Sequence, residues 1–200
     1  MLDLTNAIEE INGYKGSEKK KTLLYSGKKH LVKFPDPVVE KGKNISYINN
    51  AFSEYVGSNT FRICDFCVQN TMLATYKYNE KEKIVCACED FTDKNNVLYE
   101  FESLALLKLN DVELKNLAIN CYSCIKENGK KINYMSFLKQ MENKDCNDAI
   151  RRVFERIKID NIYELIENME EISDIRKNFY KKIIEIRYEI LKEVYEKIVN

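Results

Sequence analysis

The stretch Leu31-Val32-Lys33-Phe34-Pro35 places one lysine inside a short apolar run that a proline ends. A second β-rich run, Lys21–Tyr25, precedes it, and Ser26-Gly27 lies between the two runs as a hairpin signal. A lysine that points inward from a strand is costly unless it meets a partner. The segment therefore predicts a β-hairpin whose second strand, His30–Phe34, carries a lysine that needs either a carboxylate or an exit to water.

Residues 47–61 follow this hairpin with apolar side chains at helical spacing, and Glu54 lies on or near the flank of that predicted helix. Two further strands are expected at Val68–Tyr78 and Lys83–Phe91, around a polar turn. Glu54 is then the natural partner of Lys33. Spacing alone favours the alternative, in which Lys33 reaches water from an edge strand and Glu54 is a surface carboxylate.

The second half of the chain changes to helical periodicity. A short helix with its lead-in is expected at Lys130–Met141, and further helices are expected at Asn147–Ile157 and Ile162–Met169, the last with Asp160 as its N-cap. A long helix is expected after Ser173. The fold class is therefore α+β, with an antiparallel sheet plus one helix in residues 1–92 and an all-helical part in residues 93–200.

Composition excludes several classes of function. The 200 residues are 44% hydrophobic, and 32 basic side chains balance 32 acidic ones. A neutral chain argues against nucleic-acid binding by bulk charge. No apolar run approaches membrane-spanning length, and Met1–Thr5 lacks the order of a signal peptide. We expect a cytoplasmic protein that does not bind membranes.

The seven cysteines include two pairs with metal-ligand spacing, Cys64-x-x-Cys67 and Cys121-x-x-Cys124. Four thiolates could hold zinc, but the first pair lies where a helix turns into a strand, without the small residues that let a knuckle fold around a metal. We expect free thiols here and at Cys86, Cys88 and Cys146, and no metal site.

A nucleotide triphosphate needs a cation near its phosphates, a carboxylate that holds that cation, backbone donors over the phosphates, and a strand edge for adenine. Lys33 and Glu54 are the candidate cation and carboxylate. Gly16 and Ser17 end a glycine-containing turn that could approach phosphates, and Val85-Cys86-Ala87-Cys88 could offer the strand edge.

Several motifs in the same order resemble the HipA-like serine/threonine kinases, and in particular their CtkA-like branch. The motifs are Leu31–Pro35, Asn49–Gly57, Val68–Leu73, Ile84–Phe91, Lys130–Tyr134, Asp145–Ala149 and Ile172–Tyr180. The resemblance implies a kinase-like N-lobe that binds nucleotide in residues 1–92, and a helical remnant of the C-lobe in residues 93–200.

The resemblance also implies a role for individual residues. Lys33 would be the phosphate lysine and Glu54 its helix partner, Gly16 and Ser17 would belong to the phosphate loop, and ATP would be the nucleotide. The adenine-contacting hinge would comprise Cys86, Ala87, Cys88 and Glu89. Glu89 stands where the branch more often has lysine.

The sequence departs from the family between Phe91 and Lys130. The family has there a catalytic loop, an Asn-Phe-Asp-Arg-His-Asn-Gly-Asn-Trp-like run, and then a metal-binding Asp-x-Gly-Ser-Ser-like segment, and this chain has neither. No catalytic residue is therefore assigned, and Mg²⁺ is not expected to be held by this chain alone.

Three functions remain open from the sequence. The first is a truncated kinase-family protein that is incompetent alone but retains nucleotide or partner binding. The second is an interaction module or gene remnant with a vestigial nucleotide pocket. The third is a kinase that a second chain completes. Whether the protein is an enzyme is left undecided by the sequence.

Overall fold

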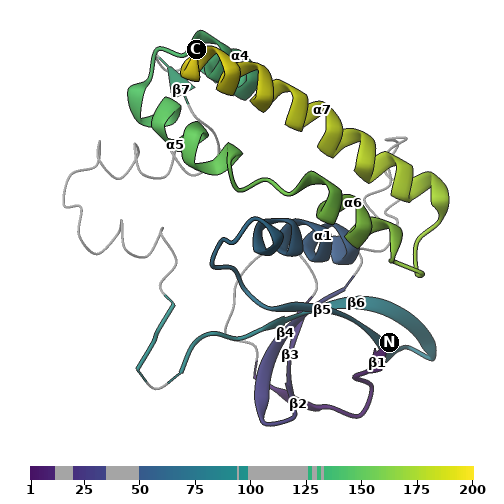
Figure 1. The fold of residues 1–200 in the computed structure, drawn as a ribbon. Coiled ribbons are helices and arrows are strands. Elements are labelled where there is room, and N and C mark those ends of the chain that lie inside the picture. The colour runs from purple at the N-terminus through teal and green to yellow at the C-terminus, as the bar shows by residue number, and fades with distance from the viewer. Residues whose placement is uncertain (12–19, 35–49, 94, 99–125, 128–129, 132) are drawn as a thin grey trace. The chain divides into compact units, whose positions relative to one another are not determined.

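The structure is a computed structural model that describes residues 1–11, 20–34, 50–93, 95–98, 126–127, 130–131 and 133–200 (Figure 1). The chain divides into two compact units, Met1–Phe91 with Lys158–Glu171, and Thr92–Ile157 with Ile172–Asn200. Lys158–Glu171 thus groups with the first unit, although it follows Thr92–Ile157 in the sequence. Within the described residues, no helix combines the length and apolarity needed to cross a bilayer.

The first unit is built on a six-stranded sheet in the order β1-β5-β6-β4-β3-β2. The strands are β1 (Leu2–Asp3), β2 (Ile8–Glu10), β3 (Lys20–Tyr25), β4 (Lys28–Lys33), β5 (Thr71–Tyr78) and β6 (Lys81–Glu89). The predicted α+β class is confirmed. The sheet is mixed rather than purely antiparallel, because β1 pairs in parallel with β5. A parallel pair needs a long connection instead of a hairpin, and here the chain between β1 and β5 provides it.

Two tight turns fix the register of the central strands. Ser26 and Gly27 have φ of 50° and 75° between β3 and β4, and Asn79 and Glu80 have φ of 49° and 61° between β5 and β6. Positive φ at both central residues matches the twist of the flanking strands. Both predicted hairpins are confirmed, with Tyr25 opposite Lys28 and Tyr78 opposite Lys81.

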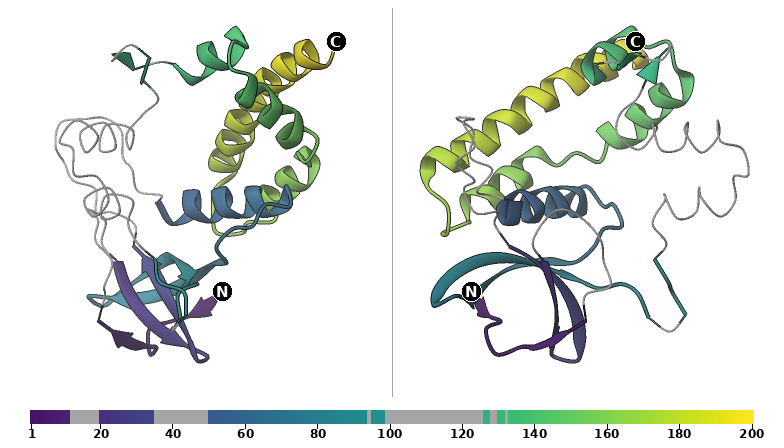
Figure 2. Two further views of the ribbon diagram at one scale, coloured as in Figure 1. Left: turned by 90° about the vertical axis from the view of Figure 1, so that its left-hand side faces the viewer. Right: turned by 180° about the vertical axis from the view of Figure 1, so that it is seen from behind.

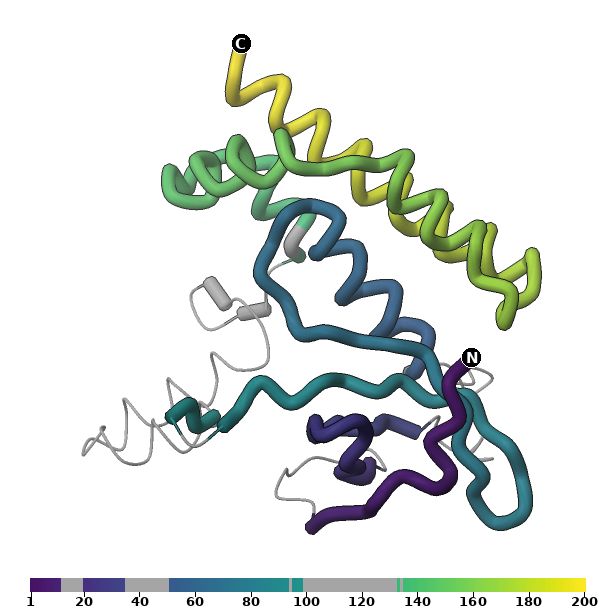
Figure 3. The backbone as a smooth tube through the Cα atoms, turned by 60° about the horizontal axis from the view of Figure 1, so that its bottom comes forward, coloured from purple at the N-terminus to yellow at the C-terminus, as the bar shows by residue number. Residues whose placement is uncertain are grey.

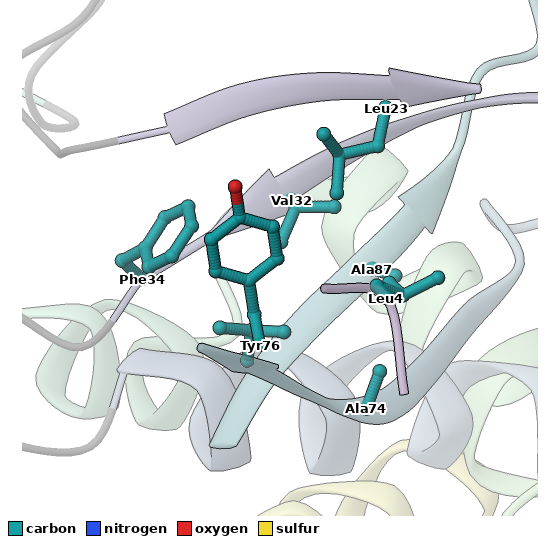
Figure 4. Packing of buried hydrophobic residues seen from close by; sticks show 8 residues of the cluster. Leu4, Leu23, Val32, Phe34, Ala74, Tyr76 and Ala87 are labelled. Atoms are coloured by element: carbon teal, nitrogen blue, oxygen red, sulfur yellow. The ribbon is translucent and has the colours of Figure 1, made fainter. Parts of the chain in front are cut away.

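One face of the curled sheet encloses the main apolar core of this unit (Figure 4). Its buried members are Leu4, Leu23, Val32, Phe34, Ala74, Tyr76, Val85 and Ala87. The Phe34 ring meets the Tyr76 ring edge-on, with centroids 5.2 Å apart, and lies 5.9 Å from that of Tyr78. Such aromatic pairs add stability beyond the area that they bury.

Helix α1 (Asn50–Ile63) lies across the other face of the sheet (Figure 2). Ala51 and Tyr55 of α1 pack there against Cys86 and Cys88 of β6. The predicted helix in residues 47–61 is confirmed within the described residues. Its apolar stripe faces the sheet, as amphipathic spacing requires.

Helix α6 (Ile159–Glu167) packs against α1 in the same unit. The prediction that Asp160 caps this helix is wrong, because the helix starts earlier and Lys158 occupies the N-cap without a side-chain hydrogen bond. Asp160 lies in the first turn, where a negative charge still favours the helix dipole. Lys158 Nζ instead pairs with Asp65 Oδ2 at 2.7 Å, just beyond the end of α1.

The second unit contains α4 (Tyr134–Gln140), α5 (Lys144–Phe154) and α7 (Asp174–Val199). It also contains the short paired strands β7 (Lys126–Glu127) and β8 (Lys130–Lys131), so the expectation of an all-helical part was too simple. Ser173 is the N-cap of α7, as predicted, although its side chain makes no capping hydrogen bond. The Asn133 and Asn143 side chains cap α4 and α5.

Aromatic and charged contacts hold the helices of this unit on α7. Phe154 of α5 stacks on Tyr195 and Tyr188 of α7 with centroids 4.5 and 5.3 Å apart. Lys139 of α4 and Lys197 of α7 both donate to Glu193, each at 2.8 Å. These two lysines, Lys139 first, lower the pKa of Glu193 to about 2.

Replacing Phe34 by Ala should cost about 3–5 kcal/mol of unfolding free energy, because it opens a cavity in the sheet core and removes two ring contacts. Urea unfolding followed by circular dichroism measures this. Phe91→Ala, at a ring that is 59% exposed, is the matched control and should change stability by less than about 0.5 kcal/mol. Equal effects of the two variants would contradict the assigned core.

Lys139→Ala should raise the pKa of the Glu193 carboxyl from about 2 toward its ordinary value of 4.5. Because the folded pKa is lowered, ionised Glu193 stabilises the fold above about pH 4.5, and this contribution disappears as the pH falls toward 2. Carbon-13 NMR titration of the carboxyl groups measures the shift. Lys144→Ala in α5 is the control, and an unmoved Glu193 titration in Lys139→Ala would refute the assigned pair.

Candidate functional site

An ion pair between the sheet and α1 is the centre of the candidate site. Lys33 is the last residue of β4, and its Nζ donates to Glu54 Oε1 of α1 at 2.7 Å. The two side chains are 23% and 39% exposed. The structure thus brings together the two residues that the sequence offered as cation and carboxylate, and Lys33 does not simply reach water.

Strand alternation decides which neighbours share this site. Lys33 and Leu31 lie on the side of β4 that faces α1, and Lys33 is opposite Cys86 in the register between β4 and β6. Cys86 and Cys88 lie on the same face, with their Sγ atoms 4.0 Å apart. Small thiols under α1 let the helix approach the sheet closely enough for Glu54 to reach Lys33.

Both thiols lie away from solvent in this position. The hydrogen bond between them and burial raise the pKa of the Cys86 thiol, whereas the same hydrogen bond lowers the pKa of the Cys88 thiol. Reactive cysteines need a lowered pKa and access to solvent, whereas Cys86 and Cys88 are buried. The pair is therefore a packing surface beside the ion pair, in agreement with the expectation of free thiols.

Ala87 and Glu89 do not join the ion pair. Ala87 points to the opposite face of the sheet and is part of the main core. Glu89 Oε1 accepts from Lys28 Nζ at 2.5 Å, and Glu89 Oε2 accepts from Asn70 Nδ2 at 3.3 Å. These contacts, Lys28 first, lower the pKa of Glu89.

The backbone of Cys86–Cys88 does not form the open edge that the sequence suggested. β6 is an interior strand, and this stretch pairs with β4 on one side and β5 on the other. Strand pairing ends at Asp90, whose N–H donates to Lys29 O at 2.8 Å. Backbone contact of Cys86–Glu89 with an adenine base stays a prediction.

A hollow of about 440 Å³ opens along α1 beside the ion pair. Its wall is formed by Ser53, Glu54, Gly57, Ser58, Phe61, Gln69 and Thr71. This volume falls in the range typical of small-molecule sites. Glu54 therefore contacts Lys33 and also borders a space that a ligand or a segment of protein could enter.

Some of the predicted site residues lie outside the described residues. These are Gly16 and Ser17 of the expected phosphate loop, and Cys121 and Cys124 of the second cysteine pair. In the first pair, Cys64 is buried and Cys67 is exposed. Within the described part of the chain, no three His, Cys, Asp or Glu side chains lie together as metal ligands.

Sequence reasoning missed a polar network at the far end of α1. Arg62 of α1 donates to Asn70 Oδ1 at 2.9 Å, and Asn70 donates in turn to Glu89. Gln69 Nε2 donates to the Glu89 carbonyl at 2.9 Å. Gln69 and Asn70 do lie in one of the quoted motifs, but nothing in their spacing pointed to Arg62.

Comparison with known proteins gives this geometry a family context. No model of a known protein family matches the chain. It is similar to the serine/threonine-protein kinase CtkA of Helicobacter pylori, with 28% identity over an alignment of 274 positions, gaps included. This alignment covers 89% of this chain and 83% of that protein. This chain is related to the HipA/CtkA-like kinases.

A solved structure supports the same relationship. The crystal structure of a Helicobacter pylori proinflammatory kinase CtkA superposes on this chain with a TM-score of 0.79 and 25% identity. The superposition covers 99% of this chain and 97% of that chain. The predicted CtkA-like resemblance and kinase-like α+β fold are thereby confirmed.

Proposed function

We propose that this CtkA-like chain binds a nucleotide through Lys33 and does not transfer phosphate by itself. The observation that carries the proposal is the 2.7 Å ion pair between Lys33 and Glu54 in a kinase-like fold. Kinases hold the lysine that meets the phosphates with a glutamate from the adjacent helix. The pair is present here in the order and on the elements that this role requires.

The arrangement of β4 and β6 supports a nucleotide as the ligand. Lys33 lies opposite Cys86, and β6 ends at Glu89, so that Asp90 lies about 13 Å further along at the usual rise of a strand. A phosphate at Lys33 and a base beyond Asp90 would leave room for the sugar between them. Leu31, which is only partly buried, would supply apolar surface along this path.

The alignment with CtkA supports the absence of transfer. It extends over 274 positions, although this chain has 200 residues, so more than seventy aligned positions have no counterpart here. Phosphoryl transfer depends on Mg²⁺ held by carboxylates and on an Asp near the acceptor hydroxyl. The motifs for both are missing between Phe91 and Lys130.

These unmatched positions also favour a second candidate, a kinase that another polypeptide completes. Such a partner would supply the carboxylates and cover the hollow along α1, whose wall includes Glu54. Protein isolated from its native source under mild conditions would then transfer phosphate, and separating the two chains would abolish transfer. Isolation as a single, inactive chain would refute this candidate.

Lys33→Ala should weaken ATP binding at least tenfold, because the phosphates lose their cation. Stability should change by only about 0.2–1 kcal/mol, because the ion pair is partly exposed. Isothermal calorimetry with and without Mg²⁺ measures affinity. Lys77→Ala, which removes another lysine in an ion pair on a strand, is the control and should leave binding unchanged.

Two results would contradict the proposal separately. Wild-type protein that releases no heat with ATP would refute nucleotide binding. Purified wild-type protein that transfers labelled phosphate from ATP, to itself or to an added protein, would refute the absence of catalysis. Glu54→Gln should weaken ATP binding less than Lys33→Ala, since it leaves the cation in place but removes its partner.

A further inference from the structure

The α1 anchor is the polar network of Lys28, Arg62, Gln69, Asn70 and Glu89 at one end of the sheet. It begins on α1, where Arg62 Nη2 donates to Asn70 Oδ1 at 2.9 Å and to the Gln69 carbonyl at 3.1 Å. It continues to β6 through Asn70 Nδ2 and to β4 through Lys28 Nζ, which both donate to the Glu89 carboxylate. One connected set of bonds thus joins the helix to both strands of the site.

The chain path explains why these residues meet. After α1 the chain turns back beneath the helix and enters β5 (Figure 3). Gln69 and Asn70 lie in that return, between the last turn of α1 and Thr71. Ser58 Oγ donates to the Gln69 carbonyl at 2.8 Å, and Asn59 Nδ2 donates to Thr71 Oγ1 at 3.1 Å. The second half of α1 is therefore hydrogen-bonded to the return along its length.

The first half of α1 meets the sheet through the ion pair of Glu54 with Lys33 and through an apolar patch. There Ala51 and Tyr55 pack on the thiols of Cys86 and Cys88. Apolar packing is non-directional. Hydrogen bonds with fixed donors and acceptors define an orientation.

We propose that Arg62, Asn70 and Glu89 are positioning residues, which fix the rotation of α1 and so hold the Glu54 carboxylate on Lys33. Arg62 and Glu54 are eight positions apart on one helix, about 12 Å along its axis. A rotation at one end moves the side chain at the other. The consequence for nucleotide affinity rests on the proposed function, whereas the effect on the ion pair does not.

Asn70 is the most informative position in the α1 anchor. Its Oδ1 accepts from Arg62 and its Nδ2 donates to Glu89, so both neighbours fix the amide orientation. Asn70→Asp keeps the shape and the contact with Arg62 but places a carboxylate against the Glu89 carboxylate. Adding Glu89→Gln exchanges the two groups, so that an amide at position 89 can donate to the carboxylate at position 70.

The test uses the free protein and a direct readout of the ion pair. Lysine ammonium groups held in an ion pair exchange slowly enough for their nitrogen-15 signals to be followed by NMR. In Asn70→Asp, we expect the Lys33 signal to shift or disappear, and in Asn70→Asp with Glu89→Gln we expect it to return. Arg62→Met removes the one member of the α1 anchor that lies on the helix, and it should have the same effect on the Lys33 signal. It replaces Asn70→Asp as the test if Asn70→Asp does not fold.

Leu4→Ala is the control, because it opens the buried core on the other face of the sheet and lowers stability without touching α1. An unchanged Lys33 signal in Asn70→Asp and Arg62→Met would overturn the proposal. The same change in Leu4→Ala would also overturn it, since general destabilisation would then explain the effect.

Titration with ATP separates this inference from the proposed function. We expect Asn70→Asp to weaken ATP binding about tenfold, and the double variant to recover most of the affinity. If wild type binds no ATP while the Lys33 signal follows the expected pattern, nucleotide binding is refuted and the positioning role stands. If ATP binds wild type and Asn70→Asp equally, with an unchanged Lys33 signal, the positioning role is refuted and nucleotide binding stands.

Discussion

The double pairing of β6 is the constraint on which the rest of the first unit depends. Because β4 and β5 pair with it on either side, its side chains can only alternate between two faces. Val85 and Ala87 therefore enter the sheet core, while Cys86 and Cys88 face α1. A shift of one residue in this register would place the thiols in the core and the core residues under the helix.

The same register determines the chemistry of the site. Lys33 is opposite Cys86, so its side chain points toward α1. On that face the small thiol side chains allow α1 to lie close to the sheet. A larger side chain at position 86 would push the helix outward and lengthen the bond from Lys33 to Glu54. The ion pair thus depends on packing below the helix as well as on the two charges.

Local signals in the sequence indicated both hairpins and α1, whereas the choice of Glu54 as the partner of Lys33 needed the family resemblance, because spacing alone favoured two separate surface charges. Ser26-Gly27 indicated the turn between β3 and β4, and the lysine in an apolar strand indicated that a carboxylate was needed. The N-terminal end of α6 was misjudged, since Asp160 is a favourable residue both at a cap and in a first turn. The contacts of Glu89 with Asn70, and of Asn70 with Arg62, were not predictable, because they depend on how the chain folds back after α1.

A lysine held by a glutamate stabilises bound phosphate whether or not a reaction follows. Catalysis requires interactions that are stronger in the transition state than in the ground state, and metal ions and a positioned Asp supply these in kinases. A chain that keeps the Lys33–Glu54 pair without those groups would stabilise the ground state and the transition state of phosphoryl transfer equally. The pair would then contribute to nucleotide affinity but not to the rate of transfer. Its nucleotide would then act as a structural ligand: at a concentration one hundred times its Kd, it would stabilise the folded state by about 2.7 kcal/mol. For such a protein, the α1 anchor would serve ligand affinity and folding stability together.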